Sequence, residues 1–177
     1  MKCIQKLPNL FKSMPLRAFL SACIFVCCIG SVGAVSDTLL PTNFKGTTLS
    51  HTYYTLSYSE ADKQAEWVAY YLTPASINGP QKRSSKFLPD PFLSNPLGSS
   101  SYIKSGYDRG HLCPAADMKL NTTSMKESFY MSNMSPQVPS FNRGIWSKLE
   151  DKIRDWALEK KGLYVVTGPL LNKNCGT

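Results

Sequence analysis

The chain has 177 residues, of which 42% are hydrophobic and 18% charged, and its formal net charge is +8 at pH 7. This balance is typical of one globular domain and excludes a disordered or collagen-like chain. The charge is concentrated at the start: residues 1–34 contain four Lys or Arg and no acid, which leaves 16 basic against 12 acidic side chains (+4) in the remainder. The same segment holds four of the six cysteines, so the remainder excludes a disulfide-dense miniprotein and a four-cysteine zinc site.

Residues 1–34 are predicted to be a signal peptide. Residues 1–17 are basic, and residues 18–35 are apolar or small without any charge, which is the pattern of a secretory signal. We expect cleavage after Ala34. Two alternatives stay open: a lipoprotein cleavage box that ends at Cys23, and an uncleaved membrane anchor, since eighteen such residues are just enough to cross a bilayer. All three interpretations predict that the rest of the chain is exported.

Two strands and a long loop are expected in the first half of the exported part. Residues 51–59 alternate and are rich in Tyr and Thr, and residues 67–73 form a second apolar run that ends at Pro74. Both patterns favour strands, which we expect to pair antiparallel. Residues 74–106 are rich in Pro and Ser and predict a long irregular loop, a kind of segment that often carries function.

The second half predicts a short strand, two helices and a core strand. Residues 107–113 favour a strand, and a capping box of Ser124 and Glu127 predicts the start of a short helix. Residues 131–143 are expected to be a loop. Apolar side chains at three- and four-residue steps predict a helix over residues 144–160, and a buried strand follows at Leu163–Thr167, only ten residues before the end.

The residues that carry chemistry cluster first in the predicted strand at 107–113. Asp108, Arg109, Gly110 and His111 follow one another, and on a strand Arg109 and His111 point to the same face. An imidazole can take a proton near neutral pH, and a guanidinium can hold a phosphate oxygen. Together they suit the attack of water on a phosphodiester. Taken alone, the motif equally fits a structural ion pair with an ordinary histidine.

A second cluster consists of Asn133, Asn142 and Glu150. Asn142 precedes the predicted long helix, where it is either an N-cap or a carbonyl ligand of a hard divalent cation such as Mg²⁺. Glu150 lies eight residues later, roughly 12 Å along a helix and toward the same side. It would hold metal-bound water rather than share a direct contact with Asn142, unless it is simply a solvated helix residue.

Taken together, these motifs resemble the DNA/RNA non-specific endonuclease family, which includes mitochondrial endonuclease G and secreted bacterial nucleases. The tetrapeptide DRGH is intact at residues 108–111 and is followed by LCPAADM at 112–118. The stretches SNMSPQ at 132–137 and FNRGIW at 141–146 are similar to the family as well. The resemblance covers nearly all of residues 43–175.

The family implies an α+β fold class, a mixed α/β fold with a central antiparallel sheet and a ββα-metal active-site motif. Residues 35–177 would form the endonuclease domain. Because the family fold continues beyond the point where this sequence stops, we expect the C-terminal part of the fold to be missing. The implied substrates are DNA and RNA, and the implied cofactor is Mg²⁺ or another divalent cation such as Mn²⁺.

The resemblance also implies a role for each candidate residue. His111 would be the general base that activates water, and Asn142 the direct protein ligand of the cation. Arg109 and Asn133 would support the phosphate and the transition state, and Glu150 would act through metal-bound water.

The resemblance suggests a further candidate at Arg83, and the sequence departs from the family pattern at Cys113. The family uses an arginine from an earlier loop, for which Arg83 is the candidate, although a solvated loop charge fits it equally. Cys113 stands where a small or apolar residue is expected, and Cys113 and Cys175 are candidates for a disulfide if the chain is exported. Anchoring through the first segment and a homodimer both stay open.

Three other functions compete with that of a nuclease. A cysteine hydrolase would use Cys113 with His111, but residues two apart on a strand do not set a thiol against a ring nitrogen at bonding distance. A non-catalytic exported module that binds nucleic acid would need a stronger charge than +4. A zinc site from both exported histidines and cysteines matches no common spacing.

Overall fold

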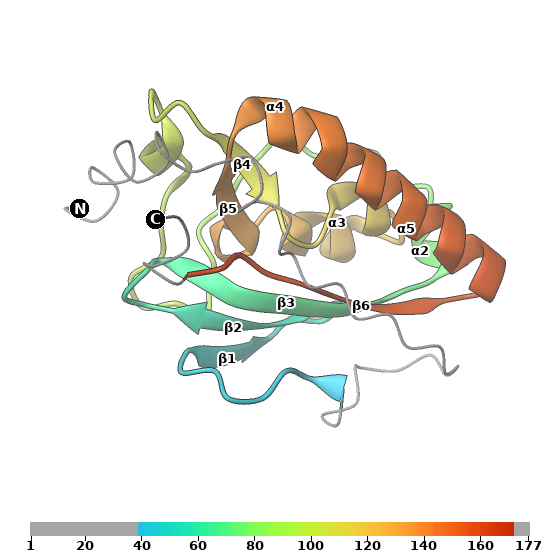
Figure 1. The fold of residues 1–177 in the computed structure, drawn as a ribbon, viewed down its shortest axis with the longest axis horizontal. Coiled ribbons are helices and arrows are strands. Elements are labelled where there is room, and N and C mark those ends of the chain that lie inside the picture. The colour runs from blue at the N-terminus through green and yellow to red at the C-terminus, as the bar shows by residue number, and fades with distance from the viewer. Residues whose placement is uncertain (1–38, 172–177) are drawn as a thin grey trace.

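A computed structural model describes residues 39–171 of the chain, which fold into a sheet covered by helices and a two-stranded ribbon (Figure 1). The strands are β1 (Thr47–Ser50), β2 (Thr55–Ser59), β3 (Gln64–Leu72), β4 (Asp108–His111), β5 (Met134–Gln137) and β6 (Leu163–Thr167), and the helices are α2 (Pro74–Ile77), α3 (Thr122–Ser128), α4 (Pro139–Phe141) and α5 (Ser147–Lys160). The predicted signal peptide and Cys175 lie outside the described residues. Within these residues, none of the helices has the length and apolar character needed to cross a membrane.

The larger sheet has the order β1-β2-β3-β6, with each neighbouring pair antiparallel. This confirms the predicted pairing of the two opening strands and the predicted strand at Leu163–Thr167. The prediction of one strand over residues 51–59 was wrong in its extent. Residues 51–54 turn the chain between β1 and β2, and the turn is closed by a hydrogen bond from the His51 N–H to the Tyr54 carbonyl (2.9 Å).

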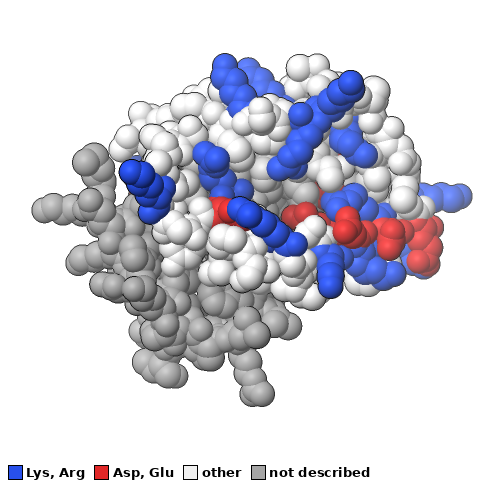
Figure 2. Space-filling view, turned by 90° about the horizontal axis from the view of Figure 1, so that it is seen from above, with Lys and Arg blue, Asp and Glu red and all other residues white. Residues whose placement is uncertain are grey.

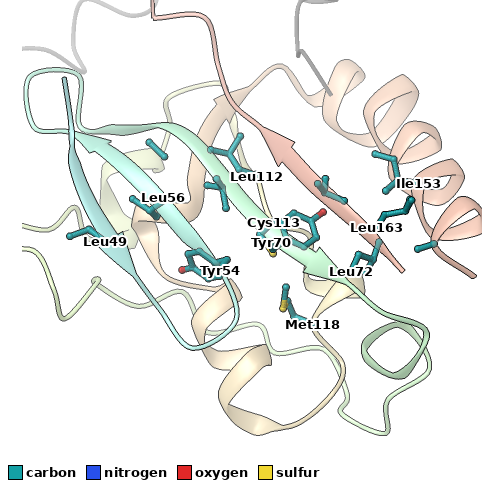
Figure 3. Packing of buried hydrophobic residues seen from close by; sticks show 14 of the residues in the cluster. Leu49, Tyr54, Leu56, Tyr70, Leu72, Leu112, Cys113, Met118, Ile153 and Leu163 are labelled. Carbon is teal, nitrogen blue, oxygen red and sulfur yellow. The ribbon is translucent and has the colours of Figure 1, made fainter. Parts of the chain in front are cut away.

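The main core lies between this sheet and α5 (Figure 3). Val68, Tyr70 and Leu72 alternate along β3 and are buried on the same face, as the two-residue period of a strand requires. Ile153 and Ala157 lie one helical turn apart on α5 and are buried in the same cluster. This packing fixes the helix that carries the candidate site against the sheet.

The expected loop at residues 131–143 is instead ordered structure. A 3₁₀ turn over Met131–Asn133 leads into β5, and α4 follows. The sequence of β5 has no alternation, and Pro136 lies within it. It becomes a strand because it pairs antiparallel with β4, where Pro136 faces Arg109, so tertiary pairing overrides a weak local preference.

Helix α3 is present as predicted, but its predicted capping box was wrong. The N-cap is Asn121, whose Oδ1 accepts from the Ser124 N–H (2.9 Å), while the Ser124 hydroxyl accepts from the Asn121 N–H (3.1 Å). Glu127 instead accepts hydrogen bonds from the Thr52 hydroxyl (2.7 Å) and the Tyr53 N–H (3.2 Å). The carboxylate therefore fastens the turn between β1 and β2 to α3.

The long helix is not the uninterrupted helix that the periodicity predicts. Between α4 and α5 the helix is kinked within Asn142–Trp146, where Gly144 has non-helical angles (φ −108°, ψ −108°). Asn142 itself has helical angles (φ −57°, ψ −48°), so the N-cap interpretation was wrong. The angular offset expected between Asn142 and Glu150 assumed a regular helix and does not apply.

Candidate active site

The site is built on β4, β5 and the helix that follows them, which is the arrangement of a ββα motif. Asp108 pairs with Gln137 and His111 with Met134. Gly110 is needed because the Gln137 side chain lies across it: a Cβ at residue 110 would come within 2.1 Å of Gln137 Cδ. Gly110 therefore allows the partner strand to approach β4 closely.

His111 ends β4 with its ring packed among aromatic side chains. Ring centroids lie 4.9 Å away for Phe129, edge to face, and 5.8 Å away for Phe87. The ring is almost completely buried, and its Nε2 has no hydrogen-bond partner among the described residues. Burial, with a smaller contribution from the charge of Arg83, lowers the pKa of His111 to about 3. The imidazole is therefore neutral at pH 7, which is the form that can accept a proton.

Two guanidinium groups flank this histidine. Arg109 Cζ lies 4.2 Å from the centre of the Phe87 ring, and Arg83 Cζ lies 5.2 Å from that of Phe129. Each arginine therefore stacks on a ring that itself touches His111. The long loop brings Arg83 to the site, as the resemblance suggested. The aromatic residues at 87 and 129 were missed, because nothing in their sequence positions shows that they meet.

Asn142 lies beside the other end of β4. Its Nδ2 donates to Asp108 Oδ2 (2.9 Å), and the same carboxylate accepts from Arg143 Nε (2.8 Å) and Nη2 (2.7 Å). Asp108 and His111 are the two ends of one strand, so about 10 Å of extended backbone separates their Cα atoms. Asn142 therefore lies beside the first residue of β4, and His111 is the last residue of the same strand.

Asn133 is completely buried and fully used in hydrogen bonds to the backbone. Its Oδ1 accepts from the Cys113 N–H (2.8 Å), and its Nδ2 donates to the carbonyls of Cys113 (2.9 Å) and Ser128 (2.8 Å). The amide therefore holds the chain directly after His111 in place. Its predicted support of the phosphate stays a prediction, and this bonding favours an indirect contribution.

Glu150 lies near a buried network of charges on the other side of the site. Asp117 accepts from the Tyr70 hydroxyl (2.8 Å) and from Arg154 Nη1 (2.8 Å). Burial and the nearby charge of Asp117 raise the pKa of Glu150 to about 7, while Arg154 and Arg83 act in the opposite direction. The charge of Arg83 acts on the pKa values of both His111 and Glu150. The residues at 117 and 154 were not predicted.

We expect Glu150→Gln to stabilise the protein at alkaline pH. With a pKa of about 7 when folded against 4.5 ordinarily, Glu150 binds more protons in the folded state between these values, so stability is lost as the pH rises through this window. In EDTA at pH 8 the variant should exceed the parent by ~1–3 kcal/mol in the free energy of unfolding. Below pH 4.5 the gain should vanish. Glu159→Gln, at the exposed end of α5, serves as the control, and an unchanged melting temperature for Glu150→Gln at pH 8 would refute the assignment.

Cys113 is unsuited to act as a nucleophile. It is fully buried as a free thiol, and burial raises its pKa well above the ordinary value. Residues 39–171 contain no cluster of three or more His, Cys, Asp or Glu side chains that could hold a metal, and His51 binds Asp90 instead (Nε2–Oδ2 2.9 Å). These observations argue against the cysteine hydrolase and the zinc site. The predicted bond to Cys175 involves a residue outside the described part.

The surface around the site carries both signs of charge. Figure 2 looks onto the side of the molecule where α4 and α5 lie, and it shows Lys and Arg side chains spread over much of this face, with acidic side chains confined to a short band. Such a face can attract a polyanion without one concentrated basic patch.

Comparisons with known proteins agree with this geometry. The model of the DNA/RNA non-specific endonuclease family matches residues 32–176. A nuclease of Nostoc sp. is 39% identical over 142 residues, which cover 77% of this chain and 50% of the relative. A nuclease of Syncephalastrum racemosum is 38% identical over 148 residues, covering 80% and 43%. The human mitochondrial nuclease EXOG is 34% identical over 123 residues, covering 68% and 33%.

A solved structure gives the same result for the fold. The crystal structure of the EndoG/EndoGI complex, described as showing the mechanism of EndoG inhibition, matches with a TM-score of 0.67 and 36% sequence identity, over 73% of this chain and 55% of that chain. The chain spans about half the length of the relatives it matches, or less. These matches confirm the predicted mixed α/β fold class with its antiparallel sheet. The chain belongs to the DNA/RNA non-specific endonuclease family.

Proposed function

We propose that this chain is the catalytic part of an exported, Mg²⁺-dependent endonuclease that hydrolyses phosphodiester bonds of DNA and RNA without sequence preference. The observation that carries the proposal is the buried imidazole of His111, whose Nε2 has no hydrogen-bond partner among the described residues and which contacts two rings, Phe87 and Phe129, that each carry an arginine. A ring nitrogen without a hydrogen-bond partner can accept a proton, and guanidinium groups near it can hold phosphate oxygens, as hydrolysis of a phosphodiester needs.

The residues present fit a hard divalent cation. The nitrogen of the Asn142 amide is bonded to Asp108, which leaves its carbonyl oxygen for a cation. Mg²⁺ prefers such oxygen ligands and often keeps several waters, and Mn²⁺ accepts the same donors. Glu150 supplies a second oxygen donor suited to binding metal-bound water. When bound, the cation would neutralise charge on the scissile phosphate and the departing 3′ oxygen.

The remaining steps belong to side chains of this chain. His111 Nε2 accepts the proton of the attacking water. Arg109 and Arg83 hold non-bridging phosphate oxygens, which are the same in every nucleotide. Contacts of this kind carry no base information, so they support tolerance of both sequence and sugar. Asn133 keeps His111 in position through the backbone of Cys113.

Digestion of plasmid DNA and of RNA by the full-length chain tests the proposal. We expect both to be cut to fragments with 5′-phosphate ends in Mg²⁺, and EDTA to stop the reaction. Binding of both nucleic acids without cleavage in Mg²⁺ or Mn²⁺ would instead support the alternative, a non-catalytic exported binding module. Fractionation of cells that produce the full chain tests export, and retention in the cytoplasm would contradict that part.

The same assay separates a metal nuclease from a thiol enzyme. Iodoacetamide should leave the cleavage rate unchanged, because Cys113 is inaccessible and its thiol stays protonated. Mass spectrometry of the Cys113 peptide should show no alkylation in the native protein and complete alkylation after unfolding in urea with a reductant. Loss of activity in step with alkylation of Cys113 would contradict the proposed mechanism.

A further inference from the structure

We propose that Asp108 and Arg143 are positioning residues that fix the orientation of the Asn142 amide, so that its carbonyl oxygen faces the divalent cation. The inference rests on the proposed function, since it concerns the cation of that site. It assigns a task to the acid of the DRGH motif and to an exposed arginine that the sequence comparison alone leaves without one.

The three side chains form a closed set of hydrogen bonds. Arg143 donates two parallel hydrogen bonds to the Asp108 carboxylate, from Nη2 to Oδ1 (2.7 Å) and from Nε to Oδ2 (2.8 Å). Asn142 Nδ2 donates to the same Oδ2 (2.9 Å). The Asp108 side chain is 18% exposed, whereas that of Arg143 is 72% exposed, so the arginine covers the carboxylate from the solvent side.

The chemistry of Asp108 makes the orientation of Asn142 unambiguous. Both oxygens of Asp108 accept from the guanidinium of Arg143, which has only donors, so the carboxylate faces Asn142 as an acceptor. A flipped Asn142 would place its carbonyl oxygen against this anion. The nitrogen must therefore face Asp108, and the oxygen must point away from it.

Arg143 has a second effect on the same carboxylate. Because its guanidinium engages both oxygens, Asp108 is prevented from turning toward a cation and replacing the neutral amide as the ligand. Asn142 and Arg143 are consecutive in the chain, and both side chains bind the same carboxylate.

Titration of the full-length chain with Mn²⁺, followed by the electron paramagnetic resonance signal of the free ion, tests the inference without nucleic acid. In Asp108→Asn, residue 108 can both donate and accept, so it no longer fixes which atom of the Asn142 amide faces it. We therefore expect the Kd for Mn²⁺ to rise about tenfold, as it does when other residues that support metal ligands are replaced. The Mn²⁺ concentration for half-maximal plasmid cleavage should rise by the same factor, and the KM for plasmid should stay unchanged.

Arg143→Gln shows whether Asp108 positions Asn142 or binds the cation itself. It also tests the inference if Asp108→Asn does not fold. If Asp108 only positions Asn142, loss of Arg143 weakens Mn²⁺ binding, by about threefold or more. If Asp108 is itself a ligand, its released oxygen should tighten binding. Lys148→Gln removes an equally exposed charge near the start of α5 and should leave the Kd unchanged within about twofold.

Failure of the inference can be told apart from failure of the proposed function. A parent that cleaves in Mn²⁺, together with variants of unchanged or tighter Mn²⁺ affinity, would overturn the inference alone. A parent that binds Mn²⁺ but cleaves neither DNA nor RNA would overturn the proposed function, and the Kd values of the variants would still decide the inference. A parent that binds no Mn²⁺ would overturn both.

Discussion

Replacing His111 with alanine should lower the rate of plasmid cleavage about 10³-fold while leaving the binding of nucleic acid nearly intact. The size follows from the usual contribution of a general base, between about 10² and 10⁴. Binding should survive because the phosphate contacts come from Arg109 and Arg83, which stack on Phe87 and Phe129 rather than on the imidazole. Single-turnover cleavage and a gel-shift titration in Ca²⁺ measure the two quantities separately.

The other described histidine provides a matched control. His51 is also buried, but its Nε2 is paired with Asp90 Oδ2 (2.9 Å) and its ring stacks on Phe92 at 4.8 Å. His51→Gln should therefore lower the melting temperature and, per folded molecule, leave the cleavage rate close to that of the parent. If His111→Ala cuts plasmid as fast as the parent, the mechanism is wrong.

Asn142→Ala should abolish cation-dependent cleavage, with a loss of about 10² or more at any Mg²⁺ concentration, because it removes the ligand that the protein itself provides. Asn142→Asp should fail as well, although a carboxylate usually binds Mg²⁺ better than an amide does. The new carboxylate would lie against Asp108 Oδ2, which is 2.9 Å from the present amide nitrogen, and two such anions repel each other.

In the double variant Asp108→Asn with Asn142→Asp, the amide at residue 108 can donate a hydrogen bond to the carboxylate at residue 142. The double variant should recover activity over Asn142→Asp alone by about tenfold, which a double-mutant cycle would register as coupling between adjacent residues. Strict additivity of the two substitutions, with the double variant no better than Asn142→Asp, would contradict the contact. Melting temperatures of all four proteins control for loss of the fold.

The sequence predicted the two opening strands, the strand of the DRGH motif and the strand at Leu163–Thr167, because their signals are local: residue type and alternation. The roles assigned to His111 and Asn142 stay predictions. β5 was taken for a loop, since its pairing with β4 is a contact between distant segments. The helical angles of Asn142 were not predicted, because the short helix α4 before it and the kink at Gly144 leave no trace in the periodicity.

The surroundings of the candidate residues were the least predictable part. That Phe87 and Phe129 enclose His111, and that Asp117 and Arg154 lie near Glu150, depends on packing between segments far apart in the chain. These neighbours set the pKa values of His111 and Glu150, so the protonation states in the site could not be inferred from residue types alone.

The buried amide of Asn133 has a consequence for how the protein fails. It joins the carbonyl of Ser128, at the end of α3, to the N–H and carbonyl of Cys113, just after the catalytic strand. Fraying of α3 would break the hydrogen bonds of Asn133, which also hold the backbone next to His111. We therefore expect the loss of activity on heating to begin with local unfolding of this helix. Substitutions that raise the heat tolerance of the protein should therefore be sought in α3, away from the proposed site.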